Sequence, residues 1–340
     1  MSNTKEPLPR VFVTCLPSAY DRLIGPGTNA VLESFARIER NTEERLLSDD
    51  ELSQRLAEAD GVIVGWPGQS NALSGPQIEA AKQLLIVGQL GQSIKQIDTA
   101  AVFARGITLV NSPSAFANAV AEFTLATMLC AKHRVVQHDR AMRSGTEAWG
   151  IRNAGTLGRE LSRSTVGLIG YGGIGRRVAE LLAPFDVELL VYDPFAGAAA
   201  GAFRVTFVPL DALLARSDVV SVHAALTAET GKMIGAGELE RMKPDALLVN
   251  TARGGLVDEA ALVAHLRRNP AFMAALDVFA SEPLAADAPL RDMENVLLSS
   301  HRSGHTKEAY ALMGVQVVED FRRFFAGEQP LHSVPAAQLA

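Results

Sequence analysis

A glycine-rich segment from Gly170 to Gly175 has the residue types and spacing of a loop that holds a dinucleotide. It follows the apolar run 165–169 and begins a stretch with helical periodicity. Glycines at these positions allow a tight turn and let a pyrophosphate approach backbone N–H groups at the helix start. Asp193 ends the next apolar run, where a carboxylate accepts hydrogen bonds from ribose hydroxyls and repels a 2′-phosphate. The segment therefore predicts an NAD site with NADH preferred over NADPH, the alternative being a sharp turn followed by a loop acid.

Three later segments each place a polar residue just after an apolar run, where ligands bind at the carboxyl edge of a parallel sheet. These residues are Arg253, Glu282 and His301. An arginine is permanently charged and binds a carboxylate through two parallel hydrogen bonds. A histidine donates and accepts a proton near neutral pH. Singly they also fit a surface charge, a turn acid and a helix cap, but their order and spacing together favour a catalytic set.

With these segments the chain resembles the D-isomer-specific 2-hydroxyacid dehydrogenase family over nearly its whole length. The matching segments are Asn250-Thr-Ala-Arg253-Gly-Gly, Asp277-Val-Phe-Ala-Ser-Glu282-Pro283, Ser299-Ser-His301-Arg-Ser-Gly304, residues 155–175, the run from His223 to Thr230, and Asn118-Ala-Val-Ala-Glu122. The resemblance implies an NAD-dependent oxidoreductase that interconverts a 2-oxo acid and its D-2-hydroxy acid.

The resemblance also implies a role for each side chain. Arg253 is expected to bind and polarise the substrate, His301 to exchange a proton with its carbonyl oxygen, and Glu282 to hydrogen-bond that imidazole. Asp277 is expected near the nicotinamide carboxamide. The residues expected to border the cofactor are Gly170, Gly172, Gly173, Ile174, Gly175, Asp193, His223, Thr230, Thr251, Ala252, Arg253, Asp277, His301 and Gly304.

The expected substrate loop departs from the family pattern. The family usually has a Gly-x-Gly loop whose backbone N–H groups hold the substrate carboxylate, and Gly91-Gln92-Ser93 stands at that place. Ser93 replaces the second glycine, and Gln92 adds an amide where a small apolar residue is usual. Gln92 and Ser93, together with Arg253 and His301, are therefore the expected substrate-binding residues.

Two further departures follow the expected catalytic histidine. The family commonly has an aliphatic residue and then two small residues there, whereas Arg302 follows His301 in this sequence and His305 comes soon after. An Arg302 side chain that points into the site would bind a second anionic group, whereas one that points outward is a surface charge. Trp66, which precedes a proline after an apolar run, is a further candidate for substrate contact or for loop packing.

The apolar runs alternate with amphipathic stretches, which is the rhythm of buried parallel strands joined by helices. We predict an α/β protein with two Rossmann-like or flavodoxin-like domains whose parallel sheets flank a cleft. Residues 1–112 with 305–340 are expected to form the substrate-binding domain, and 113–304 the NAD-binding Rossmann domain. The predicted strands are 11–14, 62–64, 84–87, 107–110, 165–170, 187–192, 219–223, 246–250, 274–278 and 296–299, and helices are predicted over 48–59 and 306–325.

The stretch 115–143 is rich in alanine and apolar over much of its surface. Its length predicts one long helix that bridges two domains or two subunits. By the resemblance, this helix supports a homodimer.

The composition excludes several classes of protein. The 340 residues favour two domains, and 48% hydrophobic with 21% charged residues exclude a mainly disordered chain. A net charge of −6 gives no broad attraction to nucleic acid. The two cysteines, Cys15 and Cys130, form no disulfide framework, and no run reaches the roughly 18 apolar residues of a membrane helix. We expect a cytoplasmic protein without nucleic-acid or membrane partners and without a metal.

Two other functions remain open from the sequence. A protein that senses NAD(H) on the same scaffold would need the cofactor site without turnover, although retention of all three catalytic candidates argues against it. A relative that oxidises another small anion, such as formate or phosphite, would keep the hydride step. Glu282 disfavours formate, because formate enzymes of the family typically have glutamine there.

Overall fold

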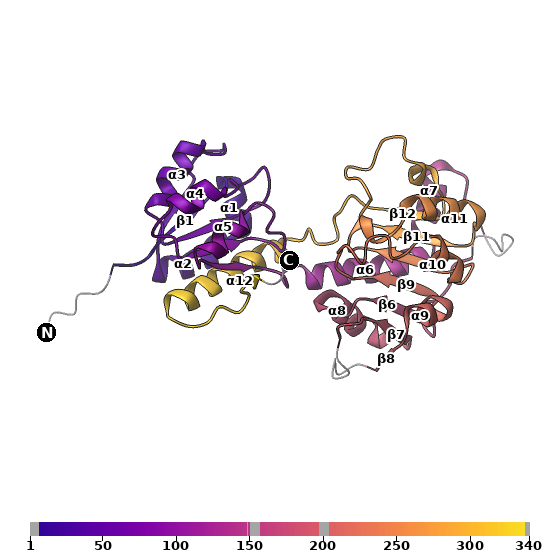
Figure 1. Cartoon of the computed structure of the whole chain (residues 1–340). Coiled ribbons are helices and arrows are strands. Elements are labelled where there is room, and N and C mark those ends of the chain that lie inside the picture. The colour runs from indigo at the N-terminus through magenta and orange to yellow at the C-terminus, as the bar shows by residue number, and fades with distance from the viewer. Residues whose placement is uncertain (1–6, 148, 150–156, 197–203, 337–340) are drawn as a thin grey trace. The chain divides into compact units, whose positions relative to one another are not determined.

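The computed structural model describes residues 7–147, 149, 157–196 and 204–336, so the start of the expected family segment 155–175 lies outside it. The chain forms two compact units (Figure 1). The first unit comprises Met1–Ala115 with His305–Ala340, and the second unit comprises Phe116–Gly304. Each contains a parallel sheet, of five and of seven strands, which confirms the predicted α/β fold class.

The first unit has the strand order β2-β1-β3-β4-β5, with all neighbours parallel. One group of helices, α1, α2 and α12, packs on one side of this sheet, and α3, α4 and α5 form the other layer (Figure 1). The bounds are β1 (Arg10–Val13), α1 (Pro17–Leu23), α2 (Gly25–Phe35), β2 (Arg37–Arg40), α3 (Asp49–Ala57), β3 (Gly61–Val64), α4 (Gly75–Ala80), β4 (Ile86–Gln89), α5 (Thr99–Ala104), β5 (Thr108–Asn111) and α12 (Lys307–Phe325).

The helix near the end of the chain, α12, completes the core of the first unit. Its Phe321 ring lies against two strand glycines, because a Cβ at Gly61 or Gly88 would come within 2.9 or 2.6 Å of that ring. Asp320 on the same helix is fully buried and accepts hydrogen bonds from the backbone N–H groups of Leu331 and His332. The two ends of the described chain therefore fold as one body.

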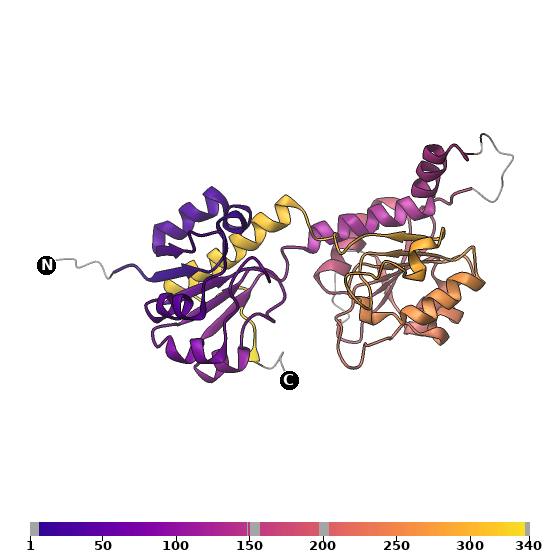
Figure 2. The ribbon, with the colours of Figure 1, turned by 90° about the horizontal axis from the view of Figure 1, so that it is seen from above.

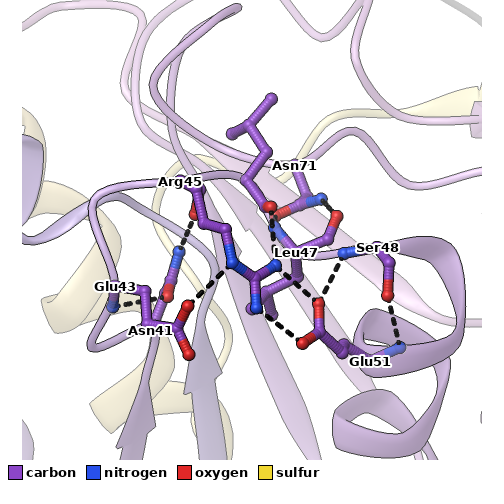
Figure 3. Close-up of polar contacts among 8 residues, drawn as sticks. Asn41, Glu43, Arg45, Leu47, Ser48, Glu51 and Asn71 are labelled. Carbon is purple, nitrogen blue, oxygen red and sulfur yellow. Dashed lines mark hydrogen bonds and ion pairs between the residues drawn. The ribbon is translucent and has the colours of Figure 1, made fainter.

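A network of polar side chains holds the loop before α3 (Figure 3). Asn71 donates to the carbonyl of Leu47 and accepts from its N–H, at 2.8 and 3.1 Å. Arg45 binds both carboxylate oxygens of Glu51, at 2.8 and 2.7 Å. Ser48 and Glu51 form a reciprocal capping box, so the helix begins where its serine and acids predict.

The second unit has the strand order β12-β11-β10-β9-β6-β7-β8, again wholly parallel. Helices α6 and α8 pack on one face of this sheet, and α9, α10 and α11 on the other. The bounds are α6 (Ala117–Lys132), α7 (Val135–Ser144), β6 (Thr165–Ile169), α8 (Gly173–Leu182), β7 (Glu188–Tyr192), β8 (Val205–Phe207), α9 (Leu210–Arg216), β9 (Val219–Val222), α10 (Ala236–Arg241), β10 (Leu247–Asn250), α11 (Glu259–Arg268), β11 (Met273–Leu276) and β12 (Val296–Leu298), with short 3-10 turns at Ala183–Phe185, Gly254–Leu256 and Pro289–Asp292.

The prediction of one long helix over 115–143 is wrong. The chain forms two helices, and Arg134 between them adopts a left-handed backbone conformation with φ of 55°, which ends α6 and redirects the chain. Helix α7 projects from the second unit, as Figure 2 shows, and buries none of its residues. Apolar content over 115–143 thus reflects a buried α6 followed by an exposed α7.

Two strands, β2 and β8, are not predicted from the sequence. Each lies at the edge of its sheet and carries no continuous apolar run, since β2 reads Arg-Ile-Glu-Arg and β8 is mostly exposed. Within the described part of the chain, no helix is long and apolar enough to cross a membrane.

Candidate active site

The glycine loop between β6 and α8 has the geometry of an anion site. Gly170 has φ of +95°, and a Cβ on Gly175 would lie 2.3 Å from the carbonyl oxygen of Gly170, so both positions require glycine. Gly172 caps α8 without a side-chain hydrogen bond. No atom of the described residues lies within 4 Å of a Cβ built on Gly172 or Gly173. The start of α8, which includes Ile174, is therefore open, and its backbone N–H groups fit a pyrophosphate.

Asp193 lies directly beside this loop. One carboxylate oxygen accepts the N–H of Tyr171 at 2.7 Å, and the other accepts those of Phe195 and Ala196 at 2.8 and 3.1 Å. A carboxylate has about four acceptor positions, so these bonds orient it and leave capacity for ribose hydroxyls. The loop and the carboxylate together fit a dinucleotide.

His223 and Thr230 bound the turn that follows β9. The His223 N–H donates to the carbonyl of Ile169 at 2.7 Å, and its Nε2 lies 2.9 Å from the hydroxyl of Ser221. Burial lowers the pKa of His223 to about 4, so its ring is neutral near pH 7. The Thr230 hydroxyl donates to the carbonyl of Ala225 at 2.7 Å. This hydrogen bond lies within the loop and stabilises it.

A buried asparagine shapes the turn that carries Arg253. Asn250 accepts the N–H of Ala252 at 3.1 Å and donates to the carbonyl of Arg253 at 3.0 Å. Arg253 is exposed, and its guanidinium donates to the carbonyl of Ala252 at 2.6 Å. Thr251 instead turns toward α6, with its hydroxyl 2.9 Å from that of Thr124. Asn250 is not among the site residues predicted from the sequence, although an asparagine at the end of a buried strand is typical of such a turn.

His301 and Glu282 form an imidazole–carboxylate pair. His301 Nδ1 lies 2.7 Å from Glu282 Oε2, while Glu282 Oε1 accepts the N–H of Phe279 at 3.1 Å. Both side chains remain about half or one-third open to solvent, at 46% and 36%. A carboxylate at Nδ1 leaves the other ring nitrogen, Nε2, able to exchange a proton with a bound molecule. The hydrogen bond that the sequence predicts between these residues is present.

Asp277 holds the backbone around His301. It is 1% exposed and accepts hydrogen bonds from the Ser299 hydroxyl at 2.6 Å and from the N–H groups of Arg302 and Ser303 at 2.7 and 2.9 Å. His301 itself has φ of 54°, a left-handed conformation that costs a non-glycine residue about 1 kcal/mol. These bonds stabilise that conformation. The expected contact of Asp277 with the nicotinamide stays a prediction.

Gly304 is also fixed by its neighbours, because a Cβ there would lie 2.7 Å from the ring of Phe116. Arg302 is exposed, and the direction of its guanidinium relative to a substrate stays a prediction. Among the described residues, no group of histidine, cysteine, aspartate and glutamate side chains could hold a metal ion.

The expected substrate loop belongs to the first unit, after β4. Gly91 has φ of +117° and donates its N–H to the Ser112 hydroxyl at 2.7 Å. The side chain of Asn111 donates to the carbonyl of Gln92 at 3.0 Å. Gln92 and Ser93 are exposed on a backbone that these bonds hold in place. Such a loop can offer backbone N–H groups to an anion.

Comparison with known proteins places these features in a family. The sequence model of the NAD binding domain of D-isomer specific 2-hydroxyacid dehydrogenases matches residues 125–303. D-3-phosphoglycerate dehydrogenase of Archaeoglobus fulgidus is 36% identical over 275 residues, which cover 81% of this chain and 51% of that protein. Glyoxylate reductase of Korarchaeum cryptofilum is 34% identical over 323 residues, covering 95% of this chain and 94% of that protein.

The solved structure of D-lactate dehydrogenase with NAD+ from Lactobacillus jensenii is 24% identical, with a TM-score of 0.81, and covers 96% of this chain and 99% of that chain. This likeness shows the fold. The chain spans about half the length of the phosphoglycerate dehydrogenases that it matches.

Proposed function

The chain belongs to the D-isomer specific 2-hydroxyacid dehydrogenase family, and from this premise we propose that it interconverts a 2-oxo acid and its D-2-hydroxy acid. The nicotinamide cofactor supplies the hydride when it is bound. The observation that carries the proposal is the His301–Glu282 pair, at 2.7 Å, on the unit that also holds the glycine loop.

Each member of the set has a distinct task. His301 gives a proton from Nε2 to the carbonyl oxygen as the hydride reaches carbon, and accepts it in the reverse direction. Glu282 holds the imidazole through Nδ1 and so fixes the orientation of the ring. Arg253 binds the carboxylate and polarises the carbonyl through its guanidinium. We propose Gln92 and Ser93 as further substrate-binding residues, because their loop can offer backbone N–H groups to an anion.

Asp193 supports NADH over NADPH as the preferred cofactor. Its carboxylate lies against the glycine loop, where a 2′-phosphate would meet a negative charge. Replacing Asp193 by alanine should weaken NADH binding about tenfold and relax discrimination against NADPH, because charge-assisted hydrogen bonds to the ribose are lost. Dissociation constants from NADH and NADPH fluorescence check this, and an unchanged preference contradicts the ribose role.

Two further proposals concern assembly and location. Helix α7 buries none of its residues, and its Val135 and Met142 are 50% and 54% exposed, which supports a homodimer formed through the 115–143 region. Light scattering on a size-exclusion column measures the mass directly. Both cysteines are free thiols, which fits the reducing cytoplasm.

NADH oxidation followed at 340 nm against a panel of 2-oxo acids tests the proposed function. The panel varies size, hydroxyl content and a second carboxylate, includes glyoxylate because one relative is a glyoxylate reductase, and is repeated with NADPH. The reverse reaction is assayed with NAD+ and 3-phosphoglycerate, because other relatives are D-3-phosphoglycerate dehydrogenases. Saturable turnover supports the proposal. NADH binding without turnover of any acid overturns it and favours a sensor of NAD(H).

A further inference from the structure

Three rings gather at the carboxyl edge of the first unit, beside the proposed substrate loop. Trp66 follows β3, whereas His305 and Tyr310 lie at the start of α12. The Trp66 and Tyr310 ring centres are 4.9 Å apart at 74°, and those of Trp66 and His305 are 5.7 Å apart at 53°. The Tyr310 hydroxyl lies 2.7 Å from His305 Nδ1, which fixes the orientation of both rings. We call Trp66, His305 and Tyr310 the ring cluster.

The ring cluster touches the substrate loop through Trp66. A Cβ on Gly91 would lie 2.9 Å from Trp66 Nε1 and 3.9 Å from the sulfur of Met313. The indole edge therefore packs on the backbone of the residue that precedes Gln92 and Ser93. The N–H of Gly91 donates to the Ser112 hydroxyl, which stabilises the backbone on which the indole packs.

The ring cluster differs from the rings that only fill the core. Phe12 and Phe321, in the centre of the same unit, are 1% and 0% exposed. Trp66 and Tyr310 are only partly buried, and His305 is exposed. Aromatic rings that stay partly accessible beside a polar loop can pack against a bound molecule.

We propose, building on the function proposed above, that the ring cluster recognises the side chain of the substrate and that the preferred substrates are 2-oxo acids with an aromatic side chain. Trp66 packs on Gly91, the residue before Gln92 and Ser93, so a carboxylate held by those two residues would have the ring cluster beside it. An aryl substituent then packs edge-to-face or offset on the rings of Trp66 and Tyr310, as aromatic pairs prefer. A small acid such as glyoxylate gains nothing from these rings.

Steady-state kinetics with phenylpyruvate and glyoxylate tests the cluster. We expect wild-type kcat/KM to favour phenylpyruvate, and Trp66→Ala to lower the phenylpyruvate-to-glyoxylate ratio about 30-fold, the loss expected for one well-packed ring. The glyoxylate value should fall by a smaller factor, because glyoxylate has no side chain that meets the ring. The matched control is Trp149→Phe, since Trp149 is 80% exposed in the second unit and should leave the ratio unchanged.

A second measurement reports binding without turnover. The chain has two tryptophans, so Trp149→Phe leaves Trp66 as the single emitter, and Trp66→Phe leaves Trp149. D-3-phenyllactate should shift the emission of Trp66, D-lactate should not, and Trp149 should respond to neither. This measurement keeps the native Trp66 and therefore does not depend on the Trp66→Ala protein folding.

The outcomes separate this inference from the proposed function. Turnover of glyoxylate with no preference for phenylpyruvate, a preference for dicarboxylic acids, or an unchanged ratio in Trp66→Ala overturns the ring cluster as the selecting surface and leaves the reductase standing. An unchanged Trp66 emission with D-3-phenyllactate also overturns it. Absence of turnover with every acid overturns the proposed function instead.

Discussion

The carboxyl edges of the two sheets differ in how they hold their side chains. In the second unit, buried Asn250 accepts the N–H of Ala252 and donates to the carbonyl of Arg253. Buried Asp277 accepts the N–H groups of the two residues that follow His301. In the first unit, the loop at Gln92 is held by one serine and one asparagine, and its neighbours are partly open rings.

This difference suggests that the two units have different tasks. Proton transfer needs a fixed geometry, so the residues proposed for it are positioned by buried polar groups that leave the backbone little freedom. Selection of a side chain needs shape and apolar surface, which the ring cluster provides. Changes in the second unit should therefore reduce kcat, and changes in the first unit should alter KM and preference.

The largest effect is expected at the imidazole. His301→Ala should lower kcat about 1000-fold, because a positioned acid–base group contributes on that order, while the NADH dissociation constant stays nearly unchanged. Glu282→Gln should lower kcat less, since the imidazole remains and loses only its carboxylate partner. Rapid-mixing kinetics and NADH fluorescence measure the two quantities. A His301→Ala protein with near-normal kcat would contradict the assignment of proton transfer to the second unit.

A smaller effect is expected at Asp277. Asparagine there keeps the size but turns an N–H₂ donor toward the N–H of Arg302 or Ser303, so kcat should fall roughly 10- to 100-fold through a displaced His301. Ser299→Ala removes one hydrogen bond to the same carboxylate and should lower kcat by a smaller factor with NADH affinity preserved. If Ser299→Ala were silent and Asp277→Asn lost only NADH affinity, the positioning role would be wrong.

The first unit is tested at Gly91. Gly91→Ala adds a Cβ at a φ of +117° and 2.9 Å from Trp66 Nε1, which should cost about 2 kcal/mol of unfolding free energy and raise KM for the 2-oxo acid. The matched control is Gly106→Ala, which also has positive φ, at +67°, but no neighbour of the described residues within 4 Å of the new Cβ. Denaturant unfolding and kinetics compare the two. Equal effects on KM would show that the Gly91–Trp66 contact is unimportant for the substrate.

The smallest effect concerns acid stability. Burial lowers the pKa values of His223, to about 4 from 6.5, and of His265, both in the second unit. As pH falls, the unfolded chain therefore binds protons at these histidines before the folded chain does. The free energy of unfolding is thus highest above about pH 6.5 and decreases as pH drops toward 4. Thermal unfolding between pH 7 and 4.5 should show this loss, and His223→Gln should reduce its slope. A slope that this substitution leaves unchanged would contradict the burial of a neutral His223.

Much of the fold follows from the sequence. Continuous apolar runs such as β3 and β10 are strands because both faces of a parallel strand are covered by helices. Strands β2 and β8 lack that pattern, because their side chains stay largely outside the core. The break at Arg134 could not be predicted, because a left-handed arginine carries no composition signal.

The candidate site could likewise be predicted from the sequence only in part. Residue order and the family resemblance suggested the pairing of His301 with Glu282, which lie on neighbouring segments. The turn held by Asp277 required the backbone path, because its partners are main-chain N–H groups that every residue has. The contact of Trp66 with His305 and Tyr310 joins opposite ends of the chain and needs the tertiary fold.

The most direct test of the account follows the hydride itself. The protein is incubated with NADH that carries deuterium at both hydrogen positions of C4 of the nicotinamide and with a 2-oxo acid that it turns over, and the product is analysed by mass spectrometry and chiral chromatography. The account predicts one deuterium at C2 and the D configuration. A product without deuterium, or with the L configuration, would contradict it.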